Sequence, residues 1–65
     1  MRILFNGEAR DVAAPTLQGV LSELGFDDKV IATALNGEFI ASTVRADKAL
    51  TEGDRIEVLA PMQGG

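Results

Sequence analysis

Residues 15–25 read Pro-Thr-Leu-Gln-Gly-Val-Leu-Ser-Glu-Leu-Gly and have the pattern of one short amphipathic helix. Thr16 is placed to cap its amino end, where a hydroxyl oxygen accepts a hydrogen bond from a free backbone N–H. Gly25 follows at the position where a residue in the left-handed region ends many helices. Gly19, inside the helix, costs up to ~1 kcal/mol relative to alanine, and we expect it to allow close packing of the helix on a sheet. Four apolar residues recur at the spacing i, i+3, i+4 and i+7 and therefore share one face: Leu17, Val20, Leu21 and Leu24.

The sequence on either side of this helix has the pattern of β-hairpins. The tripeptide Asn-Gly-Glu occurs at residues 6–8 and again at residues 36–38, and Asn-Gly favours the positive φ angles of a type I′ turn. Residues 30–35 form a continuous apolar run that contains Thr33, and periodicity alone does not determine which of its side chains face the core. The predicted strands are residues 1–6, 8–13, 30–35, 38–41 and 54–60.

The order of these elements predicts an α+β protein with a β-grasp, or ubiquitin-like, fold. One helix between hairpins crosses one face of a single mixed sheet of about five strands. The crossover through the helix allows the first and last strands to lie parallel at the centre. A tight turn is expected at residues 52–54, and a short helical turn within residues 46–51. We expect one domain over residues 1–60 and a flexible C-terminal tail over residues 61–65.

Composition argues against several classes of function. The chain of 65 residues has neither cysteine nor histidine, which removes disulfides, cysteine-ligated zinc and histidine acid–base catalysis. Its net charge is -4, and its six basic residues are scattered singly rather than arranged in the stripe that nucleic-acid binding needs. The chain has no signal-peptide pattern and no apolar run near 20 residues. We expect a cytoplasmic protein, monomeric when free, that binds protein partners but neither nucleic acid nor membranes.

The side chains of the folded region carry little chemistry of their own. Without histidine or cysteine, a serine nucleophile would need a lysine base, and no Ser-x-x-Lys spacing occurs. Asp27-Asp28 lacks the ligand spacing of a calcium loop, and Glu52-Gly53-Asp54 has ordinary turn composition. Gly-rich phosphate-binding motifs are absent from the sequence. The sequence therefore predicts a chain that binds no metal or cofactor and is not itself an enzyme.

The C-terminal residues 61–65, Pro-Met-Gln-Gly-Gly, offer a different kind of site. Pro61 cannot donate to a β-ladder, so strand pairing should end near Ala60 and the following residues should be mobile. Gly64 and Gly65 have no side chains, so this end can enter a narrow active site on another protein.

A bare terminal carboxylate is suited to activation by a nucleotide. Its pKa of about 3.3–3.7 makes it an anion at neutral pH, and an anion is a poor acyl donor. Attack on the α-phosphate of ATP would make an acyl-adenylate, with magnesium and cationic groups supplied by the partner. A sulfur nucleophile could then displace AMP and leave a thiocarboxylate.

The last strand also indicates a partner surface. Ile56 and Val58 alternate with charged residues, and if this apolar pair faces the helix, Leu59 faces the opposite side of the sheet. The same alternation in the first strand turns Leu4 away from the core. With the two strands adjacent, Leu4 and Leu59 are predicted to form an exposed apolar patch close to the tail.

Over essentially its full length, the chain resembles the ThiS-type sulfur carriers of thiamine biosynthesis. The C-terminal motif is the most specific part of this resemblance. Residues 41–47 depart from it, because many relatives carry a Pro-Arg pair and an aromatic residue in that stretch. The resemblance rests on Asn6-Gly7-Glu8, on residues 30–35 leading into Asn36-Gly37-Glu38, on Glu52-Gly53-Asp54-Arg55-Ile56-Glu57-Val58, and on Ala60-Pro61-Met62-Gln63-Gly64-Gly65.

The resemblance implies a ubiquitin-like protein that other enzymes modify. A ThiF-type adenylyltransferase, using ATP and Mg²⁺, would adenylate the Gly65 carboxylate, and a persulfide donor protein would supply the sulfur of the thiocarboxylate. The carrier would then give this sulfur to thiazole synthase, of the ThiG type, which builds the thiazole ring of thiamine. Gly64 would provide steric clearance, while Met62 and Gln63 would line the entry channel.

Three other functions are compatible with the same residues. The small subunit of molybdopterin synthase, or another ubiquitin-like sulfur carrier, would share the chemistry and differ in the acceptor. A protein modifier would instead be joined to lysines through Gly65, and a non-covalent β-grasp interaction domain would not need Gly65 at all. The short length and the ending Ala-Pro-Met-Gln-Gly-Gly favour the thiamine carrier.

Overall fold

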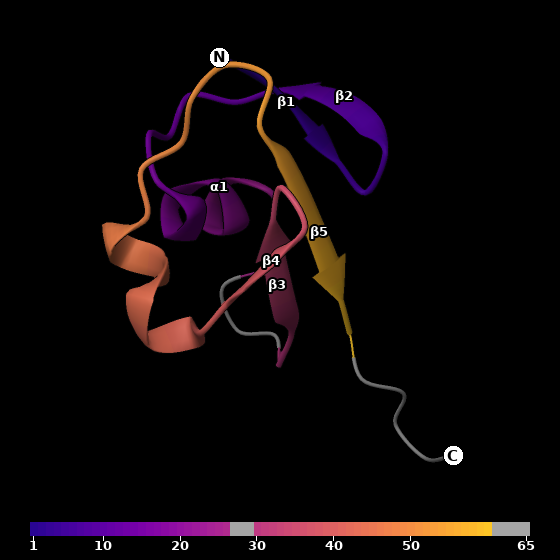
Figure 1. The fold of residues 1–65 in the computed structure, drawn as a ribbon. Helices are drawn as coiled ribbons and strands as arrows, with labels where there is room; N and C mark the ends of the chain where they lie inside the picture. The colour runs from indigo at the N-terminus through magenta and orange to yellow at the C-terminus, as the bar shows by residue number, and fades with distance from the viewer. Residues whose placement is uncertain (27–29, 61–65) are drawn as a thin grey trace.

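The computed structural model of the protein describes residues 1–26 and 30–60. Within these residues the chain forms one α-helix, one 3-10 helix and a single sheet (Figure 1). The elements in chain order are β1 (Arg2–Phe5), β2 (Glu8–Asp11), α1 (Leu17–Glu23), β3 (Ala32–Leu35), β4 (Glu38–Ile40), η1 (Ser42–Asp47) and β5 (Arg55–Leu59).

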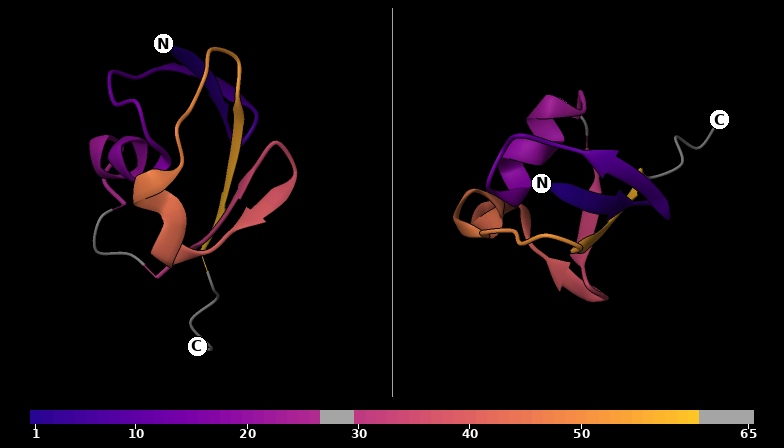
Figure 2. Two further views of the ribbon diagram at one scale, coloured as in Figure 1. Left: turned by 60° about the vertical axis from the view of Figure 1, so that its left-hand side comes forward. Right: turned by 90° about the horizontal axis from the view of Figure 1, so that it is seen from above.

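The sheet is mixed, and its five strands lie in the order β2-β1-β5-β3-β4. The first and last strands of the chain, β1 and β5, are parallel neighbours at the centre, and the other pairs are antiparallel. Helix α1 covers one face of this sheet (Figure 2). This arrangement confirms the predicted α+β, β-grasp fold with one helix on one face of a mixed sheet.

Both Asn-Gly turns form as the sequence predicts. Asn6 and Gly7 have φ angles of 50° and 85°, and Asn36 and Gly37 have φ angles of 51° and 86°. Positive φ at both central positions is the signature of a type I′ turn, whose twist matches that of the strands it joins. The tight turn at residues 52–54 is also present, with a φ of 86° at Gly53.

Helix α1 begins and ends with the capping groups that its sequence indicates. The Thr16 hydroxyl accepts a hydrogen bond of 3.1 Å from the Gly19 N–H. At the other end, Gly25 has a φ of 89° and donates to the Ser22 carbonyl, while the Phe26 N–H donates to the Leu21 carbonyl. This pair of bonds is a Schellman motif, which satisfies helix carbonyls that would otherwise lack a donor.

The core lies between α1 and the covered face of the sheet. The helix buries the apolar positions at its predicted spacing, except that Leu24 is only partly buried. In β3 the inward side chains are Thr33 and Leu35, which settles the facing that periodicity left open, and Ala32 and Ala34 face outward. The buried apolar residues are Ile3, Phe5, Val12, Leu17, Val20, Leu21, Leu35, Ile40, Leu50 and Ile56.

The short helical turn expected within residues 46–51 lies earlier in the chain, at η1, so that prediction is wrong in position. The cause is Arg45, which is only 9% exposed and donates from Nε to the Thr33 hydroxyl (3.0 Å) and from a terminal nitrogen to the Ile31 carbonyl (2.7 Å). The Thr33 hydroxyl in turn donates to the Ile40 carbonyl. A buried polar anchor of this kind leaves no apolar periodicity in the sequence.

All five strands are shorter than predicted at one or both ends. The second ends at Asp11 rather than at residue 13, and the third begins at Ala32 rather than at residue 30. Residues 13 and 14 leave the sheet because the Glu23 carboxylate accepts hydrogen bonds from the N–H groups of Ala13 and Ala14. These bonds replace the ladder contacts that a longer strand would make.

Gly19 does allow a close approach, but to the loop before the helix rather than to the sheet. A Cβ atom at this position would lie 2.7 Å from the Ala14 Cβ and 3.2 Å from the Thr16 hydroxyl oxygen. The expectation of packing on the sheet is therefore corrected. The absence of a side chain lets α1 start directly beside the segment that leads into it.

Replacing Gly19 with alanine is expected to destabilise the protein, although alanine favours helices. Overpacking against Ala14 costs about 1–3 kcal/mol, whereas the gain in helix propensity is at most about 1 kcal/mol. A net loss near 1 kcal/mol lowers the melting temperature of a domain of this size by about 4–8 °C. Thermal unfolding followed by circular dichroism measures the change, with Gln18→Ala as the control in the same helix. A higher melting temperature for Gly19→Ala would contradict the close contact.

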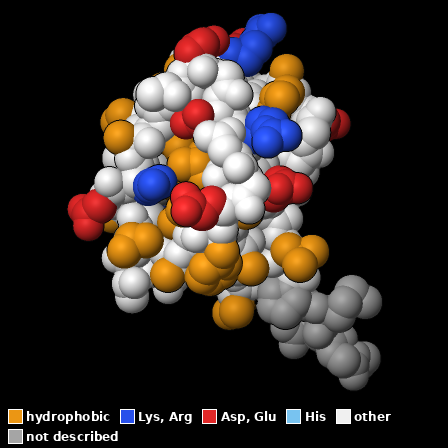
Figure 3. Space-filling view, viewed as in Figure 1, with side chains coloured by type: hydrophobic (Ala, Val, Ile, Leu, Met, Phe, Trp, Pro, Cys, Tyr) orange, Lys and Arg blue, Asp and Glu red, His pale blue; other side chains and the backbone are white. Residues whose placement is uncertain are grey.

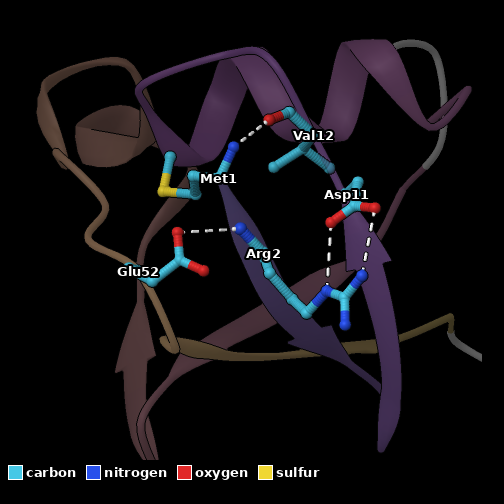
Figure 4. Close-up of polar contacts among 5 residues, drawn as sticks. All are labelled: Met1, Arg2, Asp11, Val12 and Glu52. Atoms are coloured by element: carbon cyan, nitrogen blue, oxygen red, sulfur yellow. Dashed lines mark hydrogen bonds and ion pairs between the residues drawn. The ribbon is translucent and has the colours of Figure 1, made fainter.

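The start of β1 is tied to its neighbours by polar contacts (Figure 4). The Met1 amine donates to the Val12 carbonyl (2.8 Å), and the Arg2 N–H donates to a Glu52 carboxylate oxygen (3.0 Å). The Arg2 guanidinium pairs with Asp11 at 3.1 Å, and this hydrogen bond raises the pKa of Arg2 and lowers the pKa of Asp11. These contacts link β1 to β2 and to the turn before β5. They lie at one end of the sheet, and β5 finishes at the other.

Candidate functional site

The candidate site is built on the C-terminal end of β5. This strand lies in the middle of the sheet, with β1 on one side and β3 on the other, and Ala60 is the last residue described. Because β1 and β5 are parallel, β5 ends far from the start of β1 (Figure 1). Four of the six predicted site residues lie outside the described residues: Met62, Gln63, Gly64 and Gly65.

Two asparagine side chains hold β5 near its ends. The Asn6 carboxamide accepts from the Val58 N–H (2.8 Å) and donates to the Val58 carbonyl (3.3 Å). The Asn36 carboxamide accepts from the Arg55 N–H (2.9 Å) and donates to the Asp54 carboxylate (3.1 Å). Sequence reasoning assigned both asparagines to turns alone. The repeated Asn-Gly-Glu tripeptide was the available sign that the two asparagines are equivalent. It does not reveal their hydrogen-bond partners on β5, which are distant in the sequence.

The exposed face of the sheet carries an apolar groove beside the end of β5. Ala32 and Ala34 form its floor, because their small side chains leave space between Phe39 on β4 and Leu59 on β5. Phe39 is 69% exposed and Leu59 is 73% exposed, and the strand register places Ala34 opposite Phe39 and Ala32 opposite Leu59. The groove has a volume of about 400 Å³ and is lined by Asn6, Ala32, Thr33, Ala34, Phe39, Glu57, Val58 and Leu59.

A second hollow continues this groove toward the start of β3. It is lined by Val30, Ile31, Ala32 and Leu59, so Ala32 and Leu59 belong to both. Val30 is 79% exposed. Hydrophobic side chains gather at the end of the molecule where β5 finishes, whereas charged side chains are distributed over the rest of the same view (Figure 3). Exposed apolar surface of this kind marks sites where proteins bind one another.

Leu4 and Leu59 are both exposed and face the same side of the sheet, as predicted, but they are not neighbours. Leu4 is aligned with Arg55, four residues before Leu59, which corresponds to about 13 Å along a strand. The hollow at Leu4 is lined by Gly7, Arg55, Ile56 and Glu57 instead. The expected single patch is therefore corrected: Leu59 forms the groove with Phe39 and the two alanines. Phe39 was missed because its place depends on the register between β3 and β4.

The Asp54 carboxylate makes its hydrogen bonds within and beside the turn before β5. Its carboxylate accepts from the Thr51 N–H (2.8 Å), the Thr51 hydroxyl (3.1 Å) and the Asn36 carboxamide (3.1 Å). The hydrogen bond from the Thr51 backbone, followed by that from Asn36, lowers the pKa of Asp54. Among residues 1–26 and 30–60, no three histidine, cysteine or carboxylate side chains are grouped closely enough to hold a metal ion.

The helices in the described ranges are too short to cross a lipid bilayer. On the outer face, Arg2, Asp11 and Arg55 are exposed over β1, β2 and the start of β5, whereas Glu57 lines the apolar groove. The apolar side chains of the groove adjoin the end of β5, and Glu57 is the charged residue among those that line it.

Comparison with known proteins places these features in a family. The chain matches the model of the ThiS family over residues 3–65. The sulfur carrier protein ThiS of Thermus thermophilus is 41% identical over 63 residues, which cover 97% of this chain and 98% of that protein. A crystal structure of the thiamine biosynthesis protein ThiS from Geobacter metallireducens superimposes with a TM-score of 0.84 at 26% identity, and the match covers all of both chains.

A second curated relative is much longer than this chain. The thiazole synthase of Paramagnetospirillum magneticum is 35% identical over 66 residues, which cover 100% of this chain but 20% of that protein. A protein with that name therefore contains a segment similar to the whole of the present fold.

Proposed function

The chain belongs to the ThiS family, and on that premise we propose that it is a sulfur carrier of thiamine biosynthesis whose working group is the Gly65 carboxylate. The observation that carries this proposal is the family match, which runs through residue 65 and so includes both terminal glycines. As a sulfur carrier, the chain is a co-substrate of other proteins and not a catalyst. It binds no cofactor itself, and ATP and Mg²⁺ are bound by its activating partner in the cytoplasm.

The chemistry follows from the needs of a carboxylate. A carboxylate oxygen of Gly65 attacks the α-phosphate of ATP, pyrophosphate leaves, and the product is an acyl-adenylate. The terminal sulfur of a donor persulfide then attacks the carbonyl carbon and displaces AMP. This attack forms a C–S bond and keeps the S–S bond of the persulfide. A thiol then attacks the donor's sulfur in that S–S bond, forms a disulfide with the donor and releases the thiocarboxylate. Gly64 adds no side chain beside the reacting carbonyl, so an enzyme can enclose it closely.

The folded region supports this chemistry by presenting the C-terminal end and by binding partners. The apolar groove adjoins the end of β5, so a partner that covers Phe39 and Leu59 also lies beside the point where β5 ends. We assign the first encounter to a ThiF-type adenylyltransferase and place Met62 and Gln63 in its entry channel. Leu59 contributes to the groove, and Leu4 would contribute at its own hollow only if the partner extends along β1.

The acceptor that the comparisons favour is thiazole synthase. A relative with that name contains a segment similar to this entire chain, and joining two proteins in one polypeptide raises their effective concentration relative to one another. We therefore propose that the carrier delivers its sulfur to a ThiG-type thiazole synthase for the thiazole ring. The molybdopterin, protein-modifier and non-covalent alternatives gain no support from these relatives.

The proposal is tested by following the C-terminus during activation. The purified chain is incubated with ATP, Mg²⁺, the ThiF-type enzyme of the same genome and a persulfide donor. We expect carrier-dependent exchange of pyrophosphate into ATP and an intact mass in which one oxygen has been replaced by sulfur. The same reaction without ATP serves as the control. Failure of exchange with every activating enzyme of that genome would contradict the sulfur-carrier proposal.

A further inference from the structure

The Asn6 side chain joins the first hairpin to the last strand. Asn6 and Val58 are 52 residues apart in sequence, yet the carboxamide makes two hydrogen bonds to the Val58 main chain. Val58 lies one residue before the end of β5, and two residues before the last described residue, Ala60. The contact is therefore made on the β1 side of the strand, one residue before β5 ends its pairing with β3 at Leu59.

This contact extends the parallel pairing of β1 and β5 beyond the point where β1 turns away. The Asn6 N–H donates to the Ile56 carbonyl (2.9 Å), as in a regular parallel ladder. In such a ladder the Asn6 carbonyl would next accept from the Val58 N–H. The backbone cannot continue the strand, because Asn6 has a φ of 50° and enters the turn. The side-chain oxygen accepts from the Val58 N–H in place of the backbone carbonyl, at 2.8 Å.

Asn36 makes the equivalent contact at the other end of the same strand. It occupies the same position of the second Asn-Gly turn, with a φ of 51°, and accepts from the Arg55 N–H. The two asparagines thus have the same residue type, backbone conformation and kind of partner. They differ in place, because Asn36 holds the start of β5 and Asn6 holds its end.

We propose that Asn6 is a positioning residue for the end of β5, because it holds the β1 side of the strand at Val58 while β3 holds the other side through Leu59. The inference rests on the proposed function, because it concerns how Gly65 reaches an activating enzyme. An end of β5 that is held on both sides frays less than one held by β3 alone, so fewer residues have to be ordered when the C-terminus enters a partner. Ordering backbone residues opposes binding, so Asn6 lowers the concentration of carrier that the enzyme needs.

The test compares Asn6→Gly with Asn36→Gly. Glycine accepts the positive φ angle at both sites, so each variant keeps its turn. Asn6→Gly loses the two hydrogen bonds to Val58, and Asn36→Gly loses those to Arg55 and Asp54. Pyrophosphate exchange is measured against carrier concentration. We expect Asn6→Gly to raise KM about tenfold, the penalty for ordering roughly one more residue, with kcat nearly unchanged. Asn36→Gly is expected to leave KM close to that of the unaltered chain.

Hydrogen exchange in the free protein separates positioning from a lost contact in the groove. The Val58 amide is expected to exchange faster in Asn6→Gly and not in Asn36→Gly. Asn6→Asp keeps the acceptor for the Val58 N–H and tolerates positive φ. It should therefore restore slow exchange of the Val58 amide and reverse part of the rise in KM. Equal KM values for the two glycine variants, or unaltered Val58 exchange in Asn6→Gly, would overturn the inference. A wild-type chain that supports no pyrophosphate exchange would instead overturn the proposed function, and the positioning role with it.

Discussion

Deleting Gly65 is expected to abolish adenylation and thiocarboxylate formation while leaving the folded region intact. The deletion moves the terminal carboxylate back by one residue, or about 3.3–3.6 Å of extended chain. Reacting atoms must approach to about 3–3.5 Å, and a displacement of about 1 Å costs on the order of a hundredfold in rate. We therefore expect pyrophosphate exchange to fall by at least about a hundredfold. Thermal unfolding should not change, because residue 65 lies beyond the last strand.

The shortened chain also provides a test of how the partner is bound. If the groove supplies much of the contact, the chain without Gly65 should compete with the full chain for the activating enzyme. The competition is measured as a rise in the apparent KM of the full chain. Full activity of the shortened chain would contradict the sulfur-carrier proposal and would favour a non-covalent interaction domain.

Placing charges in the apolar groove is expected to give the second-largest effect. In Phe39→Asp combined with Leu59→Asp, carboxylates replace two apolar side chains that are 69% and 73% exposed in the free protein. A partner that buries this surface would have to desolvate both charges. Losses of 2 kcal/mol or more are typical of central interface residues, so we expect binding to the ThiF-type enzyme to weaken by about a hundredfold.

The groove variant needs a control in which the replaced residue is apolar, exposed and away from this face of the sheet. Val44 lies in η1 and is 46% exposed, so Val44→Asp adds one carboxylate outside the groove and is compared with each groove substitution made singly. Leu4→Asp tests separately whether the partner also reaches the hollow beside β1. Binding is measured by titration calorimetry, and circular dichroism verifies the fold of each variant. Unchanged affinity of the groove variant would exclude the groove as the docking surface.

Much of the fold could be predicted because its signals are local in the sequence. The two Asn-Gly turns, the Thr16 cap and the apolar spacing of α1 each depend on residues a few positions apart. The central parallel pairing followed from the order of the elements. The position of η1 could not be predicted, because it depends on buried hydrogen bonds of Arg45 to Thr33 and to the main chain of Ile31.

The candidate site was predictable only in part for the same reason. Exposure of Leu59 followed from alternation along β5, but its neighbours depend on the registers among β3, β4 and β5. Those registers place Phe39 in the groove and leave Leu4 outside it. The contact between Asn6 and Val58 likewise joins residues that are 52 positions apart in the sequence. The roles of Met62, Gln63, Gly64 and Gly65 stay predictions, since they lie beyond the described residues.

The placement of Met1 determines how the protein should be attached to a surface. Met1 lies at the opposite end of the sheet from the end of β5 (Figure 1), and its nitrogen donates to the Val12 carbonyl. An affinity handle fused ahead of Met1 converts this amine to a peptide N–H, which is still a donor. Immobilisation through such a handle would therefore orient every molecule with its groove toward the solution, which suits biosensor chips and capture resins.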